Sequence, residues 1–290
     1  MNPATVKTRK PDWLKIPIPC GDNYFQLKNK LQKKGLPTIC QSARCPNITE
    51  CWNHQQATFL IMGAVCTRDC LFCQVPSGIP VGLDDDEDQK VWQMAEMMDL
   101  NYIVITSVTR DDLPDKGSGH FAKVIRLLKK NRPQMKVEVL VPDFSGESLY
   151  LDHVLQAAPD VLAHNVETVP ALYPLINRRA ESFRHTLQIL EISKKKDWIT
   201  KTGVMLGLGE TWAQIEELFG ILKTIGVDIL TIGQYLQPDK RCIPVAKYYS
   251  PQEFAAMKEF ALTFGFGGVE SGPFVRSSYH AEQLFKAVVN

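Results

Sequence analysis

The sequence lacks any long hydrophobic run and carries almost no net charge. Its longest apolar stretch, residues 59–65, has seven residues, whereas a membrane-spanning helix needs about 20. The opening MNPATVKTRKPDWLK has no apolar core of a secretory signal, so a cytoplasmic protein is expected. A formal net charge of +1 argues against a basic nucleic-acid binder. We therefore expect neither a membrane nor a nucleic acid as a partner, and a monomer.

Positive charge is concentrated near the start of the chain. Residues 1–51 contain nine Lys or Arg and three Asp or Glu, whereas the remainder has a net charge of −5. Such a segment steers an acidic protein partner or is a solvated arm. The sequence leaves both interpretations open.

Apolar, β-rich runs alternate with helical patterns after residue 57. Strands are predicted at residues 57–62, 102–106, 136–141, 161–165, 199–205 and 228–233, and helices at residues 86–98, 120–131, 147–157, 182–195, 212–224 and 251–263. This alternation predicts a parallel sheet with right-handed crossovers. Six units fall short of the eight in a closed barrel. We therefore predict an α/β fold, a partial (β/α)6 barrel, with a doubly wound sheet as the alternative.

The barrel is predicted to occupy residues 56–240 of the chain. An N-terminal extension (1–55) is interrupted by prolines, and only its residues 24–34 have a helical pattern. A C-terminal extension (241–290) follows the barrel. Thr211 and Ser250 are predicted to cap the helices that follow them.

Polar residues follow each predicted strand. Cys66 follows the first strand, Ser107 the second and Gln234 the sixth. In parallel α/β folds the carboxyl ends of the strands form the mouth of the active site. The pattern therefore predicts an enzyme whose chemistry takes place at that mouth.

Cysteine is concentrated in one region, with six of the eight residues between Cys40 and Cys73. A reducing compartment and a long chain argue against disulfides. The close spacing of the cysteines therefore indicates that they bind metal. The spacing Cys66-x3-Cys70-x2-Cys73 supplies thiolates for three corners of a four-iron cluster. It resembles that of the radical S-adenosylmethionine enzymes, which also place an aromatic residue such as Phe72 before the third cysteine. Zinc and a redox Cys70–Cys73 pair are the alternatives.

A second set of thiols, Cys40-x4-Cys45-x5-Cys51, lies in the proline-interrupted extension. Three thiols suit another iron–sulfur cluster. The alternative is a zinc site that His54 completes.

The whole chain resembles the lipoyl synthase family over roughly residues 35–285. Besides the two cysteine sets, the matching stretches are SVTRDDLPD (107–115), VPDF (141–144), HNVETVP (164–170), TGVMLGLGET (202–211), TIGQYLQP (231–238) and GPFVRSSYHAE (272–282). The combination of two cysteine triads with the RSSY motif, residues 276–279, is highly specific.

The resemblance implies two 4Fe–4S clusters. Cys66, Cys70 and Cys73 would hold the cluster that cleaves S-adenosylmethionine, and Cys40, Cys45 and Cys51 would hold an auxiliary cluster. A serine of the RSSY motif would be the fourth auxiliary ligand. We place that role on Ser278, with Ser277 as the less favoured choice. An alkoxide is a harder ligand than a thiolate, so it provides a weak corner for a cluster that surrenders sulfur. By itself, the same motif is typical of a helix cap.

The implied reaction inserts two sulfur atoms at C6 and C8 of an octanoyl chain on a lysine of a lipoyl carrier protein or domain. Two S-adenosylmethionine molecules each yield one deoxyadenosyl radical, and the sulfur comes from the auxiliary cluster. Flavodoxin or ferredoxin is expected as the electron donor. Both clusters are expected to face one mouth, because the radical and the sulfide must each reach the same chain.

Four further residues are candidates for binding S-adenosylmethionine: Ser107, Asn165, Glu167 and Arg178. Ordinary hydrogen bonding within loops is the alternative for each. Asp111 and Asp112 are interpreted as turn caps, and Cys242, where the family leads us to expect histidine, as a buried thiol. Arg276 and Tyr279 are expected to order the serine loop or to line the octanoyl channel.

Three other functions remain as hypotheses. They are sulfur insertion into a free small molecule by another radical enzyme, a non-catalytic iron–sulfur carrier, and a zinc-binding interaction protein. The RSSY motif argues against the first, and the polar loops after the strands argue against the second.

Overall fold

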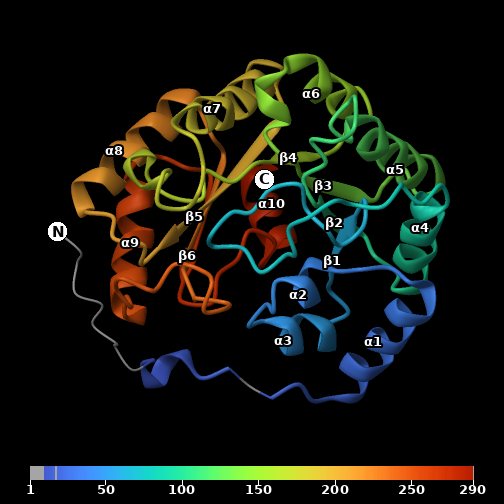
Figure 1. Ribbon diagram of the computed structural model, residues 1–290, viewed down its shortest axis with the longest axis horizontal. Coiled ribbons are helices and arrows are strands. Elements are labelled where there is room, and N and C mark those ends of the chain that lie inside the picture. The colour runs from blue at the N-terminus through green and yellow to red at the C-terminus, as the bar shows by residue number, and fades with distance from the viewer. Residues whose placement is uncertain (1–9, 17, 290) are drawn as a thin grey trace.

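Seven parallel strands form one curved sheet in the computed structural model, which describes residues 10–16 and 18–289 (Figure 1). The order is β1-β2-β3-β4-β5-β6-β7, so each strand pairs with its neighbour in sequence. The strands are β1 (Thr58–Ile61), β2 (Tyr102–Ser107), β3 (Lys136–Leu140), β4 (Val161–Ala163), β5 (Ile199–Leu206), β6 (Ile229–Gln234) and β7 (Gly268–Gly272). Residues 1–9, the start of the basic segment, lie outside the described residues.

Helices cover the outer, convex face of the sheet (Figure 1). They are α4 (Glu87–Met97), α5 (Ser118–Asn131), α6 (Ser148–Leu155), α7 (Ala180–Lys195), α8 (Trp212–Ile225) and α9 (Pro251–Thr263). A last helix, α10 (Ala281–Val289), packs against β6 and β7. The α/β fold with a partial parallel barrel is confirmed.

The sheet has one strand more than the sequence predicts. β7 has the sequence GVESG and pairs in parallel with β6, for example Ile229 with Gly268. Two glycines and two polar residues give this segment little strand propensity. It joins the sheet through its neighbours, and so part of the predicted C-terminal extension belongs to the barrel.

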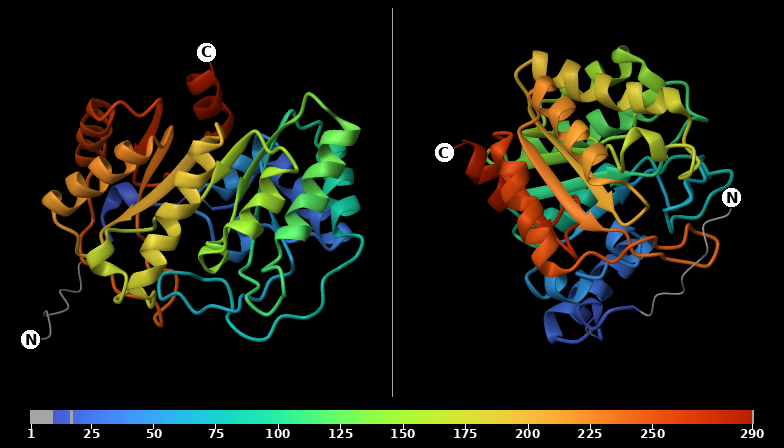
Figure 2. Two further views of the ribbon diagram at one scale, coloured as in Figure 1. Left: turned by 90° about the horizontal axis from the view of Figure 1, so that it is seen from above. Right: turned by 90° about the vertical axis from the view of Figure 1, so that its left-hand side faces the viewer.

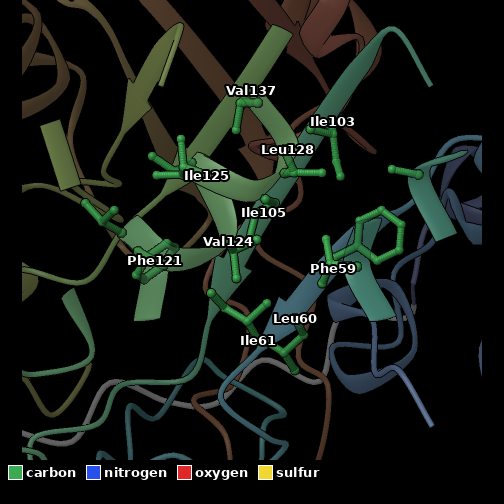
Figure 3. Close-up of a cluster of buried hydrophobic side chains, with 14 of the residues drawn as sticks. Phe59, Leu60, Ile61, Ile103, Ile105, Phe121, Val124, Ile125, Leu128 and Val137 are labelled. Atoms are coloured by element: carbon green, nitrogen blue, oxygen red, sulfur yellow. The ribbon is translucent and has the colours of Figure 1, made fainter. Parts of the chain in front are cut away.

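The core lies between the sheet and the helices. Figure 3 shows β1, β2 and β3 packed against α5, with Phe59, Ile105 and Phe121 fully buried. A second apolar cluster, which includes Phe219 and Phe254, joins α8 and α9 to β5 and β6. A parallel sheet is expected to bury the face that its helices cover.

Both predicted caps are confirmed. Thr211 accepts a hydrogen bond from the Gln214 amide, and Ser250 accepts one from the Glu253 amide. In each case the third helical residue bonds back to the cap, which completes a capping box.

Within its described residues, the N-terminal extension contains three α-helices rather than the single predicted one. They are α1 (Asp22–Lys34), α2 (Ile39–Ser42) and α3 (Ile48–Asn53). Helices of four and six residues are too short to show an apolar period. Tyr24 of α1 packs on Trp52 of α3 with ring centroids 5.2 Å apart. Within the described ranges, no helix combines the length and apolarity needed to cross a membrane.

The two ends of the barrel carry different segments. Helix α10 lies at one end, and the long connection between β1 and α4 runs along the other (Figure 2). In a parallel sheet that connection marks the carboxyl ends of the strands.

Candidate functional site

The first cysteine triad lies in a compact loop after β1. The Cys66 amide donates to Pro76 O at 2.8 Å, and Gly78 N donates to Cys66 O at 2.9 Å. The Cys73 amide donates to Cys70 O at 3.0 Å, which closes a turn. The backbone thus holds the three thiols on one small loop at the carboxyl end of the sheet.

Arg68, between the first two cysteines, ties this loop to two strands. Its guanidinium donates to Asp111 at 2.7 and 3.0 Å and to Asp143 at 2.7 and 2.8 Å. Burial alone would raise the pKa of Asp143, but the hydrogen bonds and charge of Arg68 hold that pKa well below its usual range. The loop is therefore anchored to the segments after β2 and β3 by charge-assisted hydrogen bonds.

The segments after β4 and β6 also hydrogen-bond to this cysteine loop. Leu71 N donates to Ile176 O at 3.2 Å, and Ile243 N donates to Leu71 O at 2.9 Å. The Cys242 thiol, 8% exposed, lies 3.6 Å from Cys73 O. The prediction of a buried thiol at Cys242 is confirmed, and its position shows that the segment after β6 backs the triad.

The second cysteine triad lies on the short helices of the extension. Cys40 is in α2, Cys51 is in α3 and Cys45 lies between them, with its amide 2.9 Å from Cys40 O. Burial, followed by the charge of neighbouring thiols, raises the pKa of Cys40 to about 11 and that of Cys51 to about 12. Thiols with such values stay protonated at neutral pH unless a metal centre offsets their charge.

The second triad lines a cavity of about 250 Å³ together with Ser278 and Arg276. The Ser278 hydroxyl accepts a hydrogen bond from Thr58 Oγ1 at 2.8 Å. Both serines line the larger cavity described next, but only Ser278 also lines the smaller one, and the Ser277 hydroxyl donates to Asn165 Oδ1 at 3.0 Å. Of the two serines, Ser278 is therefore the one beside the second triad.

A cavity of about 450 Å³ runs inside the curved sheet and borders both triads. Cys40 and Cys45 line it from one side, and Cys73 lines it from the other. The triads do not share one mouth as expected: the first follows the carboxyl end of β1, whereas Ser278, beside the second, bonds to the first residue of β1. Much of the wall is apolar, with Ile39, Phe72, Val104, Leu140, Met205 and Val275.

Two of the four candidates for binding S-adenosylmethionine, Asn165 and Glu167, line the large cavity. Burial raises the pKa of the Glu167 carboxyl, and the charge of Arg178 partly opposes this. Arg178 lies 5.9 Å from the centre of the Phe72 ring. Among the described residues, its buried Nε and Nη1 have no hydrogen-bond partner. Buried, unpaired guanidinium donors mark a place for an anionic ligand group.

Ser107 is not among the residues that line the large cavity. It is the last residue of β2, and Ile61 of β1 is its strand partner. Its hydroxyl is buried and has no partner in the described part of the chain. It thus remains an unsatisfied donor near the carboxyl end of the sheet, outside the residues that line the large cavity.

The donor sets fit iron–sulfur clusters. Each triad offers three soft thiols, which are the ligands these clusters prefer. Within the described residues, no three His, Cys, Asp or Glu side chains are arranged to hold a single metal ion. The three thiols gathered at each triad suit such a cluster, and the buried Nε and Nη1 of Arg178, near the first triad, have no partner among the described residues.

Sequence reasoning missed Arg68 and misread its partner. Asp111, interpreted as a turn cap, pairs with Arg68, and Asp112 pairs with Arg110 at 2.9 Å. The position of Arg68 between two cysteines was the available signal. Gly203 was also missed: a Cβ atom there would lie 2.7 Å from Asn165 Oδ1, so only glycine leaves room for that amide.

Comparison with protein families gives two matches. Residues 60–222 match the radical SAM superfamily, and residues 2–45 match the N-terminal domain of lipoyl synthase. The lipoyl synthase of Caldicellulosiruptor saccharolyticus is 47% identical over 98% of this chain and 100% of its own length. That of Myxococcus xanthus is 48% identical over 97% of this chain and 95% of its own.

Solved structures of low sequence identity share the fold. The FeFe-hydrogenase maturase of Carboxydothermus hydrogenoformans matches with a TM-score of 0.55 at 13% identity, over 91% of this chain and 68% of that one. Coproporphyrinogen III oxidase of Escherichia coli, a radical SAM enzyme, matches with a TM-score of 0.51 at 16% identity. The match covers 77% of this chain and spans 57% of that enzyme.

Proposed function

The chain belongs to the lipoyl synthase family of the radical S-adenosylmethionine superfamily, and from this premise we propose how its residues serve the reaction of that family. The enzyme inserts two sulfur atoms at C6 and C8 of an octanoyl chain carried on a lysine of a lipoyl carrier protein. It uses a 4Fe–4S cluster and S-adenosylmethionine.

The loop after β1 holds the first cluster through Cys66, Cys70 and Cys73. When bound, this cluster supplies the electron that cleaves S-adenosylmethionine, and a second cluster supplies the sulfur. Arg68 keeps the loop in place through Asp111 and Asp143. Three thiols leave one position without a protein ligand, where S-adenosylmethionine has room to bind.

Cys40, Cys45, Cys51 and Ser278 hold the second, auxiliary 4Fe–4S cluster. All four line the same cavity of about 250 Å³. The serine oxygen is harder than the three sulfur ligands, so its bond to iron is the weakest of the four. Ser278 would therefore hold the iron that the cluster can release most easily.

Asn165, Glu167 and Arg178 bind S-adenosylmethionine at the carboxyl ends of the strands. The unpaired donors of Arg178 suit a carboxylate, and the carboxylate of Glu167 suits an ammonium or hydroxyl group. Ser107 adds its free hydroxyl at the end of β2.

The octanoyl chain enters the large cavity between the two triads. Apolar side chains such as Val104, Leu140 and Met205 line the cavity, and each methylene buried there contributes about 0.8 kcal/mol. The octanoyl chain can be in van der Waals contact with both the deoxyadenosyl radical and the cluster sulfide only if it lies between them. The carrier protein stays outside, and a flavodoxin or ferredoxin delivers electrons to a monomeric enzyme.

One observation carries the proposal: cysteines of both triads and the RSSY serine line one cavity, much of whose wall is apolar. The test is an anaerobic incubation of the reconstituted protein with S-adenosylmethionine, a strong reductant and an octanoyl-lysine peptide, read by mass spectrometry. Peptide with two added sulfur atoms and about two deoxyadenosines per peptide supports it. Deoxyadenosine without sulfurated peptide contradicts the assigned auxiliary site.

A variant separates the two cluster assignments. Ser278→Ala is expected to keep the first cluster and deoxyadenosine formation but to lose sulfur insertion. Ser271→Ala is the matched control, because this residue of β7 loses only a 2.8 Å hydrogen bond that its hydroxyl donates to Phe254 O of α9. Normal sulfur insertion by Ser278→Ala refutes the serine role.

A further inference from the structure

A segment of the chain crosses the inside of the barrel between the two proposed sites. We call residues 273–280, between β7 and α10, the crossing segment. Its Val275 carbonyl passes over Gly233 of β6, where a Cβ atom would lie 2.2 Å from that oxygen. Its Ser278 reaches the first residue of β1 through Thr58. The segment therefore spans the barrel interior from β6 to β1.

Ser277 occupies the middle of this crossing. Its hydroxyl donates to Asn165 Oδ1 at 3.0 Å, although 112 residues separate the two. Asn165 Oδ1, Thr231 Oγ1 and Ser277 Oγ all lie within 3.1 Å of the position that a Cβ atom would take at Gly203. The missing side chain of Gly203 thus makes the space in which the Ser277–Asn165 contact forms.

Each end of this contact leads to one proposed site. On one side, Asn165 hydrogen-bonds the Glu167 carboxylate, which also interacts electrostatically with Arg178. Arg178 in turn interacts with the thiol of Cys70 in the first triad. On the other side, the next residue is Ser278, beside the second triad. Two adjacent serines therefore contact different proposed sites: Ser277 contacts the S-adenosylmethionine site and Ser278 contacts the auxiliary site.

We propose that Ser277 is a positioning residue that couples S-adenosylmethionine binding to the state of the auxiliary site. The coupling rests on the proposed function, since it needs Ser278 at the auxiliary cluster and Asn165 at the cosubstrate. The Ser278 hydroxyl accepts a hydrogen bond from Thr58, and a bond to the auxiliary cluster would anchor the crossing segment further. Ser277 then keeps the amide of Asn165 oriented before the cosubstrate arrives.

The proposed coupling changes the affinity for S-adenosylmethionine. Binding to a preorganised site avoids the loss of conformational freedom that binding to a mobile site entails. S-adenosylmethionine therefore binds more tightly when the auxiliary site is loaded, and the two sites stabilise each other reciprocally. Such coupling limits radical formation in molecules that have no sulfur to deliver.

The test is the dissociation constant of S-adenosylmethionine, measured by anaerobic calorimetry without reductant. The full-length protein with both clusters is compared with a Cys40→Ala, Cys45→Ala, Cys51→Ala variant, which assembles only the first cluster. The loaded protein is expected to bind about fivefold more tightly or better. In the Ser277→Ala background, the ratio of the two constants is expected to fall below about twofold.

Controls separate this proposal from the proposed function. Ser271→Ala removes one hydroxyl from β7 outside both sites and should keep the full ratio. Iron analysis of every sample checks cluster content. Equal constants for loaded and triple-variant protein, or a ratio that persists in Ser277→Ala, overturn the coupling while the proposed function stands. Failure of the wild type to assemble a second cluster overturns the proposed function itself.

Discussion

Replacement of Arg68 by alanine tests how the first cysteine loop is held. The Asp143 side chain is 2% exposed, and Arg68 contacts both of its oxygens as well as both oxygens of Asp111. Removing one partner from a buried ion pair leaves an uncompensated charge, which costs about 3–5 kcal/mol. We therefore expect Arg68→Ala to reduce the free energy of unfolding by about that amount.

Urea unfolding of the metal-free protein, followed by circular dichroism, measures this loss. With an m value of ~3 kcal/mol per molar, the midpoint falls by about 1 M or more. The pKa of Asp143 is depressed in the folded state, so its contribution is present above the unfolded value of about 3.9 and is lost as the pH falls below it. The stability difference between the wild type and the variant should therefore be smaller at pH 3 than at pH 7, because the contribution of Asp143 is lost progressively as the pH falls toward its depressed folded-state pKa.

The matched control is Arg241→Ala, because Arg241 pairs with Asp239 at 3.1 Å while its own side chain is 82% exposed. Exposed pairs contribute little, so the midpoint should hardly move. The reasoning is refuted if Arg68→Ala and Arg241→Ala shift the midpoint equally at pH 7, or if the effect of Arg68→Ala is the same at pH 3.

Three further changes test other parts of the site. Cys66→Ala should abolish deoxyadenosine formation, as measured by chromatography, and persistence of the nucleoside would show that the triad is misassigned. Gly203→Ala places a Cβ atom 2.7 Å from Asn165 Oδ1 and should weaken S-adenosylmethionine binding by about 1–3 kcal/mol in calorimetry; unchanged affinity contradicts the tight fit. Burial lowers the pKa of His164 to about 4, whereas the unfolded value is about 6.5, so stability should fall as the pH drops from 6.5 to 4. Urea midpoints should show a shallower fall for His164→Asn over that range, and equal slopes would refute the buried neutral histidine.

Much of the fold was predictable because its signals are local. The first six strands and the helices α4 to α9 have apolar patterns of the expected period, and the caps at Thr211 and Ser250 depend on residues three positions away. β7 escaped prediction because GVESG has neither an apolar pattern nor strand propensity. Pairing with β6 creates that strand.

The cysteine triads were equally predictable, because each lies within a short stretch of sequence. The residues that anchor the first triad could not be predicted in this way. Arg68 finds Asp111 and Asp143, which lie 43 and 75 residues away. Nothing in the local pattern distinguishes these carboxylates from turn caps.

By itself, the sequence determined the α/β alternation, the two sets of thiols and the motifs that identify the family, since periodicity and spacing act over a few residues. Only the tertiary structure decided that the triads approach one cavity from opposite ends of β1, and that Ser278, which the resemblance already favoured, lines the smaller cavity with the second triad. The physical reason is that curvature of the sheet brings residue 58 to residue 278, and residues 165 and 203 to residue 277, inside it. Such contacts depend on how every strand pairs with the next, and no short stretch of the chain encodes them.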